Sequence, residues 1–158
     1  MGGLFPPFYF KNVLDLSPII CKKLVINIDT GESPMNEQAA YQARLEASIN
    51  RLMDTIKQDY YNWTLRNRPV SELSEINLKM IQEFNESLTY SVGQKYIKIM
   101  REGSAVWGFI VNTDFDKKFN RGDILKAASW NTPARNKPRG NILLNDFSWV
   151  RWTGPEYL

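Results

Sequence analysis

The 158-residue sequence contains no histidine and a single cysteine, Cys21. Without an imidazole, the Ser-His-Asp and Cys-His arrangements of nucleophilic catalysis are excluded, and so is the mixed His and Cys ligand set of ordinary zinc sites. A lone thiol forms no disulfide within the chain, which favours a reducing compartment. These absences predict a protein that is not an enzyme and that uses neither a metal nor another cofactor.

Long hydrophobic runs are also missing. Charged residues or prolines interrupt every apolar stretch well before the roughly 20 residues that a membrane-spanning helix needs. Residues 1–7 lack a basic n-region, and the apolar run 17–21 is too short for a secretory signal and is followed by Lys22 and Lys23. The sequence therefore predicts no membrane association, and we expect a cytosolic protein.

The charges that are present are unevenly distributed. Residues 1–94 contain 9 Lys and Arg against 11 Asp and Glu, whereas residues 95–158 contain 11 against 6. Clustered positive charge attracts phosphate or carboxylate surfaces but says nothing about the fold. The alternative interpretation is a basic face that is simply solvated.

The helical part of the chain is preceded by an N-terminal extension, residues 1–34, in which residues 23–29 have the pattern of a strand. Another interpretation is that translation starts at Met35, because Gly31 and Glu32 can be encoded by a purine-rich ribosome-binding sequence upstream of it.

A long amphipathic helix is predicted to follow. Ser33 is placed as its N-cap and Pro34 at its first position, and Pro69 should end it. Its apolar residues recur in steps of three and four, as in a helix with one buried face, at Leu45, Ile49, Leu52, Ile56, Tyr60 and Trp63.

A second helix is predicted to start near Ser71 or Ser74 and to end before Gly93. Its apolar stripe consists of Leu73, Ile76, Met80, Phe84 and Leu88. The short connection favours an antiparallel helical hairpin over residues 35–93, with the two stripes as core. As an alternative, the helices at 35–67 and 72–91 form a surface for homo-oligomerisation.

The C-terminal part, residues 94–158, contains short apolar or alternating runs separated by turn residues, a pattern typical of β-strands. Strands are predicted at 95–101, 105–111, 123–128, 141–144 and 147–152, with the first two forming a hairpin, and loops at 113–122 and 129–140. The predicted fold is α+β: an N-terminal antiparallel helical hairpin packed with a small C-terminal antiparallel sheet or open barrel.

The candidate binding site lies in this basic β module. Residues 126–140 contain no acidic residue, and tryptophans follow closely. Cations beside indole rings are how single strands and nucleotides are held. The predicted anion- or nucleic-acid-binding residues are Lys126, Trp130, Arg135, Lys137, Arg139, Arg151 and Trp152.

The alternative is that the late tryptophans fill the core while the cations are solvated. On a continuous strand, the odd spacing of Trp149 and Trp152 allows only one of them to face the core. We expect the loop residue Trp130 to be less buried than the inward-facing tryptophan. Gly140 is interpreted as a position where the backbone could approach an anion closely.

Two other motifs receive less support. Asp114, Asp116, Asn120 and Asp123 could be oxygen ligands for a cation, but the offsets of an EF-hand loop are missing, and a solvated turn is the preferred interpretation. Cys21 beside two lysines could be a reactive thiol, but it has no histidine partner.

Part of this module is similar to known sequences. The stretch Val106-Trp-Gly-Phe-Ile-Val111, the segment 119–141 with its Lys-Ala-Ala-Ser-Trp-Asn-Thr-Pro-Ala-Arg-Asn-Lys-Pro-Arg-Gly-Asn core, and the ending Trp152-Thr-Gly-Pro-Glu-Tyr-Leu158 resemble the C-terminal part of small uncharacterised proteins of tailed bacteriophages. The resemblance covers roughly the last 60 residues. It implies a phage accessory protein or minor virion component, located in the cytoplasm of an infected bacterial host or in the virion, and it transfers no catalytic residue.

Three functions follow as hypotheses. The first is a non-enzymatic accessory protein that binds an anionic partner, nucleic acid above all, through the basic loop. The second is a structural or protein-interaction component, in a virion or against a host protein, that assembles through its helices. The third is a binder of a small phosphorylated signal in counter-defence.

Overall fold

The computed structural model describes residues 34–101, 103 and 105–157. The chain divides into two units between Glu37 and Gln38, and the fold described below is that of the second unit, Gln38–Leu158, together with residues 34–37, which begin its first helix. The predicted strand at 23–29, the N-cap Ser33 and the thiol of Cys21 lie outside the described residues.

The long helix α2 (Pro34–Leu65) has the predicted start and the predicted apolar stripe. The stripe residues from Leu45 to Tyr60 are buried, whereas Trp63 at its end is 45% exposed. The helix ends at Leu65 because Arg66 and Asn67 adopt positive φ angles of 48° and 63°, which an α-helix cannot accommodate. A short 3-10 helix, η1 (Val70–Glu72), follows Pro69.

The second helix, α3 (Glu75–Ser87), starts at the later of its two predicted positions. The Ser74 hydroxyl accepts a hydrogen bond from the Asn77 N–H at 3.2 Å and so caps the first turn. The prediction that this helix continues almost to Gly93 is wrong, because the chain becomes the strand β1 (Leu88–Val92). Leu88 continues the four-residue steps of the apolar stripe on α3, and it also falls in the two-residue alternation of β1 with Tyr90 and Val92. Its place in the sequence therefore fits a helix and a strand equally well.

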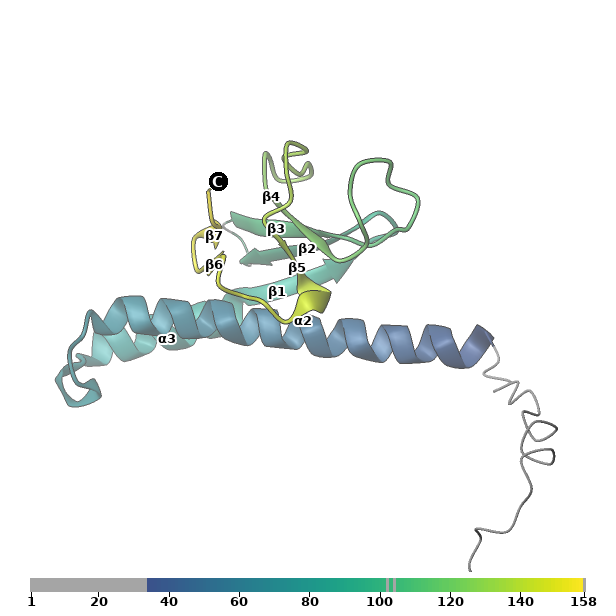
Figure 1. The fold of residues 1–158 in the computed structure, drawn as a ribbon. Helices are drawn as coiled ribbons and strands as arrows, with labels where there is room; N and C mark the ends of the chain where they lie inside the picture. Colours follow the sequence, from purple (N-terminus) through teal and green to yellow (C-terminus); the bar gives the residue numbers. More distant parts are fainter. Residues whose placement is uncertain (1–33, 102, 104, 158) are drawn as a thin grey trace, which may run out of the picture. The chain divides into compact units, whose positions relative to one another are not determined.

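The sheet contains five antiparallel strands in the order β1-β2-β3-β4-β5 and is open (Figure 1). After β1 come β2 (Tyr96–Arg101), β3 (Ala105–Val111), β4 (Asp123–Lys126) and β5 (Gly140–Asn141). The predicted hairpin of β2 and β3 is confirmed. With the two helices packed against this sheet, the fold is α+β.

The last predicted strands are shorter than expected or absent. β4 ends at Lys126 rather than residue 128. Instead of a strand at 141–144, the chain forms the 3-10 helix η2 (Ile142–Leu144), because the Asn141 side chain caps the Leu143 N–H at 2.9 Å. The predicted strand 147–152 is reduced to β6 (Val150–Arg151), which pairs with β7 (Gly154–Pro155) in a separate two-stranded sheet.

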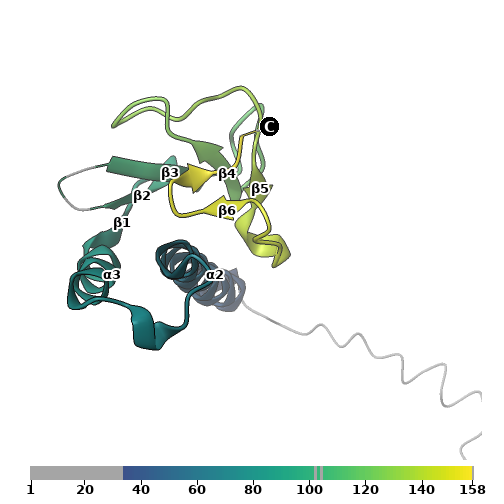
Figure 2. The ribbon, with the colours of Figure 1, turned by 90° about the vertical axis from the view of Figure 1, so that its left-hand side faces the viewer.

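The helices α2 and α3 lie on one side of the five-stranded sheet (Figure 2), and a different core packs on each of its faces. On the face toward α2 and α3, here the helical face, Ile97, Ile99 and Ile110 pack with the α2 stripe in the main core. On the opposite side, here the loop face, a second core consists of Phe109, Val111, Phe119 and Leu125. The strand alternation separates these two sets, since consecutive side chains point to opposite faces.

Both late tryptophans contact the main core, so the expectation that only one of them faces it is wrong. Trp149 is buried, and the half-buried Trp152 lies with its ring centre 5.2 Å from that of Tyr60 and 6.2 Å from that of Phe84. The alternation argument fails because residues 152 and 153 form a turn between β6 and β7 rather than a continuation of one strand.

Candidate functional site

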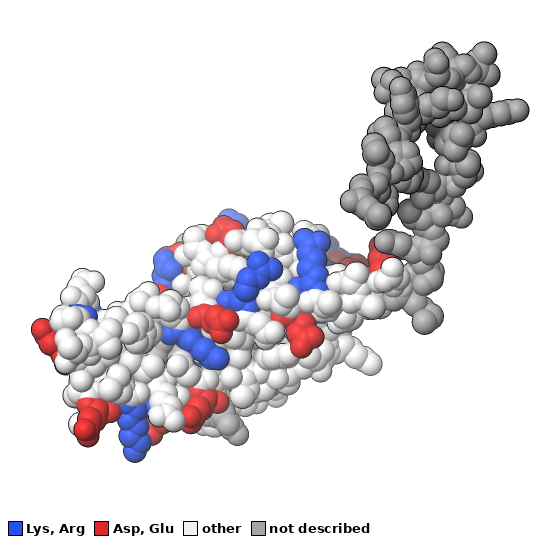
Figure 3. Space-filling view, turned by 90° about the horizontal axis from the view of Figure 1, so that it is seen from below, with Lys and Arg blue, Asp and Glu red and all other residues white. Residues whose placement is uncertain are grey.

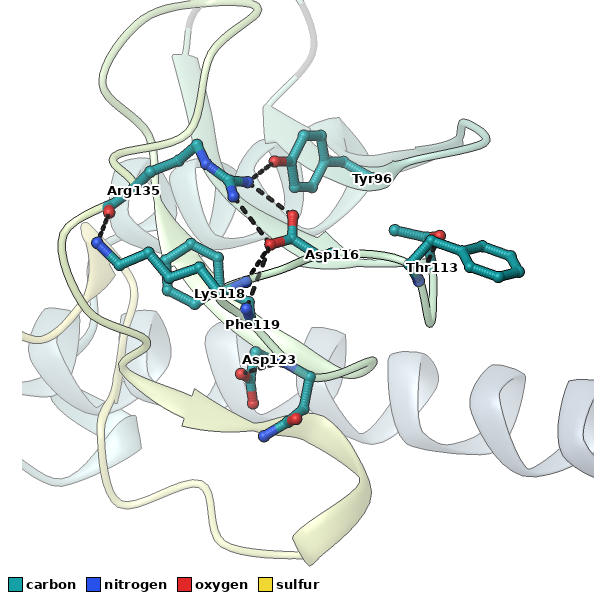
Figure 4. A network of polar contacts seen from close by, with 9 residues as sticks. Tyr96, Thr113, Asp116, Lys118, Phe119, Asp123 and Arg135 are labelled. Carbon is teal, nitrogen blue, oxygen red and sulfur yellow. Dashed lines mark hydrogen bonds and ion pairs between the residues drawn. The ribbon is translucent and has the colours of Figure 1, made fainter.

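Two loops, residues 112–122 and 127–139, cover the loop face and meet at Asp116 (Figure 4). The Asp116 carboxylate accepts hydrogen bonds from the N–H groups of Lys118 at 2.9 Å and Phe119 at 3.2 Å, which shape the first loop. Its two oxygens also accept hydrogen bonds from the two terminal nitrogens of Arg135, each at 2.8 Å. The Asp116 side chain is only 1% exposed.

These contacts make the Asp116–Arg135 pair a fixed structural link. The hydrogen bonds from the Arg135 guanidinium, followed by those from the backbone, hold the pKa of the Asp116 carboxyl well below its ordinary value. Arg135 also donates to the Tyr96 hydroxyl and lies 4.9 Å from the centre of the Phe119 ring. Lys118 donates to the Arg135 carbonyl oxygen at 2.6 Å. Both loops are therefore tied to each other and to the second core.

An open hollow of about 530 Å³ lies beside this pair. It is lined by Gln94, Lys95, Thr113, Phe115, Asp116, Lys117 and Arg135. Phe115 is 93% exposed, although a phenylalanine is ordinarily buried. The Phe115 N–H donates to the Thr113 hydroxyl at 3.2 Å, a contact that shapes the turn from which this ring projects.

A second exposed ring lies on the other side of Tyr96. A pairing of Ala127 with Pro133 closes the short loop that carries Trp130. Lys98, two residues after Tyr96 on the same face of β2, lies 5.1 Å from the centre of the Trp130 ring. Its ammonium also donates to the Trp130 carbonyl at 3.3 Å. Trp130 is 48% exposed, in line with the expectation that it is less buried than the inward-facing tryptophan.

These residues form one continuous surface, which we call the basic aromatic surface. It consists of Lys95, Tyr96, Lys98, Phe115, Lys117, Trp130 and Arg135. Its carboxylate, Asp116, is already paired with Arg135, so the remaining cations leave the surface positive. On the helical side of the molecule, by contrast, basic and acidic side chains are interspersed (Figure 3).

The structure brings two of the seven predicted site residues, Trp130 and Arg135, onto this surface. Lys126 has a different environment, because its ammonium donates to the Pro155 carbonyl at 3.3 Å and lies 3.4 Å from the centre of the Tyr157 ring. Arg139 donates to the Lys137 carbonyl at 3.1 Å, and the Lys137 side chain is exposed.

Arg151 and Trp152 belong to a third environment beside α2. Arg151 forms an ion pair with Glu156 at 3.1 Å, and the Trp152 N–H donates to the Asp59 carboxylate at 2.7 Å. An open hollow of about 330 Å³ is lined by Asp59, Asn62, Trp63, Arg151, Trp152 and Thr153. Its carboxylate makes it a poorer match to a polyanion than the basic aromatic surface.

The other motifs of this region are structural. A Cβ at Gly140 would lie 2.2 Å from Trp149 Nε1, so this glycine makes room for an indole ring. Asp114 pairs with Arg121 at 2.9 Å, and Asp123 accepts the Asn120 N–H at 2.9 Å. Within residues 34–101 and 105–157, no three His, Cys, Asp or Glu side chains gather in a way that could hold a metal ion.

Sequence reasoning missed Lys95, Tyr96, Lys98, Phe115 and Lys117. One signal was available: Tyr96 and Lys98 alternate with the apolar Ile97 and Ile99, so the face of β2 opposite the core already had an aromatic ring and a cation. No comparable signal marked Phe115, because a phenylalanine between two aspartates is compatible with either a buried or an exposed position.

No helix in the described part of the chain is long and apolar enough to cross a membrane. Neither a curated protein nor a solved structure matches the sequence. A family match covers residues 12–155, and thus α2, α3 and the seven strands of the described part of the chain. The chain belongs to the family described as "Family of unknown function (DUF7717)".

Proposed function

We propose that this chain is a small non-enzymatic accessory protein that binds nucleic acid, single-stranded first of all, through its basic aromatic surface. The observation that carries this proposal is the exposure of Phe115 and Trp130 among lysines on one face of the sheet. The C-terminal resemblance to proteins of tailed bacteriophages supports a place in the cytoplasm of an infected host or in the virion.

The charges of the surface favour a polyanion. Lys95 and Lys117 line the hollow, and Lys98 lies beside Trp130. None of these three lysines has a carboxylate partner within the ion-pair distance in the described structure. Lysines of this kind can bind phosphates without first losing an internal ion pair, and each bound phosphate releases condensed counterions.

The exposed rings favour unpaired bases over a duplex. A base stacks on an aromatic side chain only when it is free of its neighbours in a double helix, and each stacked base contributes about 1–3 kcal/mol. Phe115 and Trp130 flank the segment of surface formed by Tyr96 and Arg135. The fixed Asp116–Arg135 link holds the backbone of both loops in place, so binding requires little ordering of the protein.

The ionic part of the proposal is tested by fluorescence anisotropy with a labelled oligo-dT strand. Three phosphate contacts on a single strand give a slope near −0.7 × 3, so affinity should fall about 20-fold between 50 and 200 mM salt. The triple substitution Lys95→Ser, Lys98→Ser and Lys117→Ser should remove this dependence. The charge-matched control is Arg51→Ser, Lys57→Ser and Lys79→Ser on the helices. Equal losses in both variants, or no binding by the native chain, would contradict the proposal.

The aromatic part is tested by Phe115→Ala in the same assay. Loss of one stacked base should weaken binding by about 5- to 150-fold. Tyr157→Ala is the matched control, because Tyr157 is also highly exposed but lies beside Lys126. Binding of mononucleotides as tightly as oligonucleotides would instead favour a small phosphorylated ligand in the hollow, whose volume is within the usual range for such sites.

A second candidate function is a protein-interaction component that assembles through its helices. The observation in its favour is that Ile76, Leu78 and Met80 on α3 are exposed, Ile76 by 72%. Apolar residues grouped on one helix are typical of an interaction surface. Ile76→Lys would abolish such an assembly, as measured by light scattering, and would leave oligo-dT binding unchanged.

A further inference from the structure

The first strand of the sheet, β1, has an open outer edge. It lies at one end of the strand order and pairs with β2 over all five residues. In the part of the chain that the structure describes, no strand pairs with its other side. An edge of this kind presents a row of backbone donors and acceptors to any strand that can reach it.

The hairpin connection shows which backbone groups point outward. The Gly93 N–H donates to the Tyr96 carbonyl at 3.0 Å, so these two residues form a hydrogen-bonded pair. Because such pairs alternate in an antiparallel ladder, Ser91 and Thr89 direct their backbone groups to β2. The N–H and C=O groups of Leu88, Tyr90 and Val92 therefore point to the open edge.

The composition of this edge does not oppose pairing. Residues 87–94 read Ser-Leu-Thr-Tyr-Ser-Val-Gly-Gln and contain neither a charged residue nor a proline. Natural proteins usually protect an exposed edge with lysine, proline or a bulge to prevent association. The irregularity of this sheet lies between β2 and β3, away from β1. The edge thus lacks the features that keep other edges unpaired.

The residue pattern of β1 is complementary to itself when reversed. We propose that β1 pairs antiparallel with β1 of a second copy of this chain, about a two-fold axis at Tyr90. Leu88 then lies opposite the second copy's Val92, Thr89 opposite its Ser91, and Tyr90 opposite its Tyr90. Apolar side chains meet on one face and hydroxyl side chains on the other, and both kinds of cross-strand pair are favourable.

This register also agrees with the direction of the backbone groups. Because Leu88, Tyr90 and Val92 direct their groups outward, each of them becomes a hydrogen-bonded residue of the new pair. Tyr90 and Val92, which are 37% and 67% exposed, lie on the helical face opposite Ile99 and Ile97 and would cover each other across the junction.

The pairing leaves the basic aromatic surface open. The two-fold axis of an antiparallel strand pair is perpendicular to the sheet, so the loop faces of both copies lie on the same side of a continuous ten-stranded sheet. The dimer therefore does not depend on the proposed function, and it would present two basic aromatic surfaces side by side.

The first test is the mass of the full chain in solution, measured by light scattering over a range of concentrations. The native chain should be a dimer. Tyr90→Pro removes an N–H that points to the edge and not to β2, so the hairpin keeps its bonds while the dimer dissociation constant rises about tenfold or more. The matched control is Ile76→Lys on α3, which should remain dimeric.

The second test is disulfide trapping in a Cys21→Ser background. Tyr90→Cys places two thiols across the axis, with Cα atoms about 5.5 Å apart, and should cross-link on mild oxidation. Val92→Cys is the control, because its two copies would be about 14 Å apart and should not. A monomeric native chain, cross-linking at both positions or at neither, or loss of the dimer in Ile76→Lys alone would overturn the proposal.

Discussion

The clearest quantitative prediction concerns Gly140→Ala. The glycine begins β5, and its backbone packs directly against the indole of the buried Trp149. A Cβ at this position would lie 2.2 Å from Nε1, 2.3 Å from Cε2 and 2.8 Å from Cδ1 of that ring. Real Cβ atoms are essentially never found within 3.0 Å of such a neighbour, so either the ring or the strand must move until the 2.2 Å contact has opened to at least that distance.

The cost of that movement follows from the density of the main core. Trp149 is buried, with its ring centre 6.4 Å from that of Trp107 and 6.2 Å from that of Phe147, so a shift of the indole disturbs these neighbouring rings. Overpacking of this kind costs about 1–3 kcal/mol, and the rigid indole places this site near the upper value. For a chain of this length, about 3 kcal/mol lowers Tm by about 6–12 °C.

The assay is thermal and urea unfolding followed by circular dichroism. Trp149→Phe should destabilise the chain by itself. The double variant of Gly140→Ala and Trp149→Phe should lose less free energy of unfolding than the two single variants together, because the smaller ring makes room for the methyl group. A coupling of about 1 kcal/mol or more is expected. Unchanged stability in Gly140→Ala, or strict additivity of the two substitutions, would refute this account of the contact.

Two further predictions concern stability. Because the pKa of Asp116 is lower in the folded chain than in the unfolded chain, its ionised form stabilises the fold above the unfolded value of about 3.9, and this contribution is lost as pH falls toward the folded pKa. The difference in urea midpoint between the native chain and Asp116→Asn should therefore shrink between pH 6 and pH 3, and a constant difference would contradict the role of Arg135. Ser74→Ala should cost about 1 kcal/mol by removing the cap of α3, whereas Ser71→Ala should be neutral in the same urea titration.

The sequence predicts α2 well because its local signals agree, whereas the predicted core stripe of α3 is wrong at Ile76 and Met80, which are exposed. Pro34 begins α2, the chain leaves the helix before Pro69, and the apolar steps of α2 match its buried stripe. The end of α3 was predicted wrongly because Leu88 fits two periods. Only the pairing of β1 with β2, which joins residues up to 13 positions apart, decides between a helix and a strand there.

The candidate site was less predictable, for a different physical reason. Long cationic side chains reach partners that are distant in sequence, such as Asp116 for Arg135 and Pro155 for Lys126. A run of basic residues in the sequence therefore does not make a basic patch in space. Arg135 and Trp130 reach the basic aromatic surface because of the way their loop folds over β2, which no local pattern encodes.

The separation of the hydrophobic interior into two parts has a consequence for how the molecule fluctuates. The loops that carry Phe115 and Trp130 rest on only four fully enclosed side chains, whereas the helices share a much larger cluster. Subglobal opening of the smaller cluster needs less free energy than complete unfolding. Amide protons of the two loops should thus exchange well before those of α2, because the loops share one small cooperative unit while the helices stay intact.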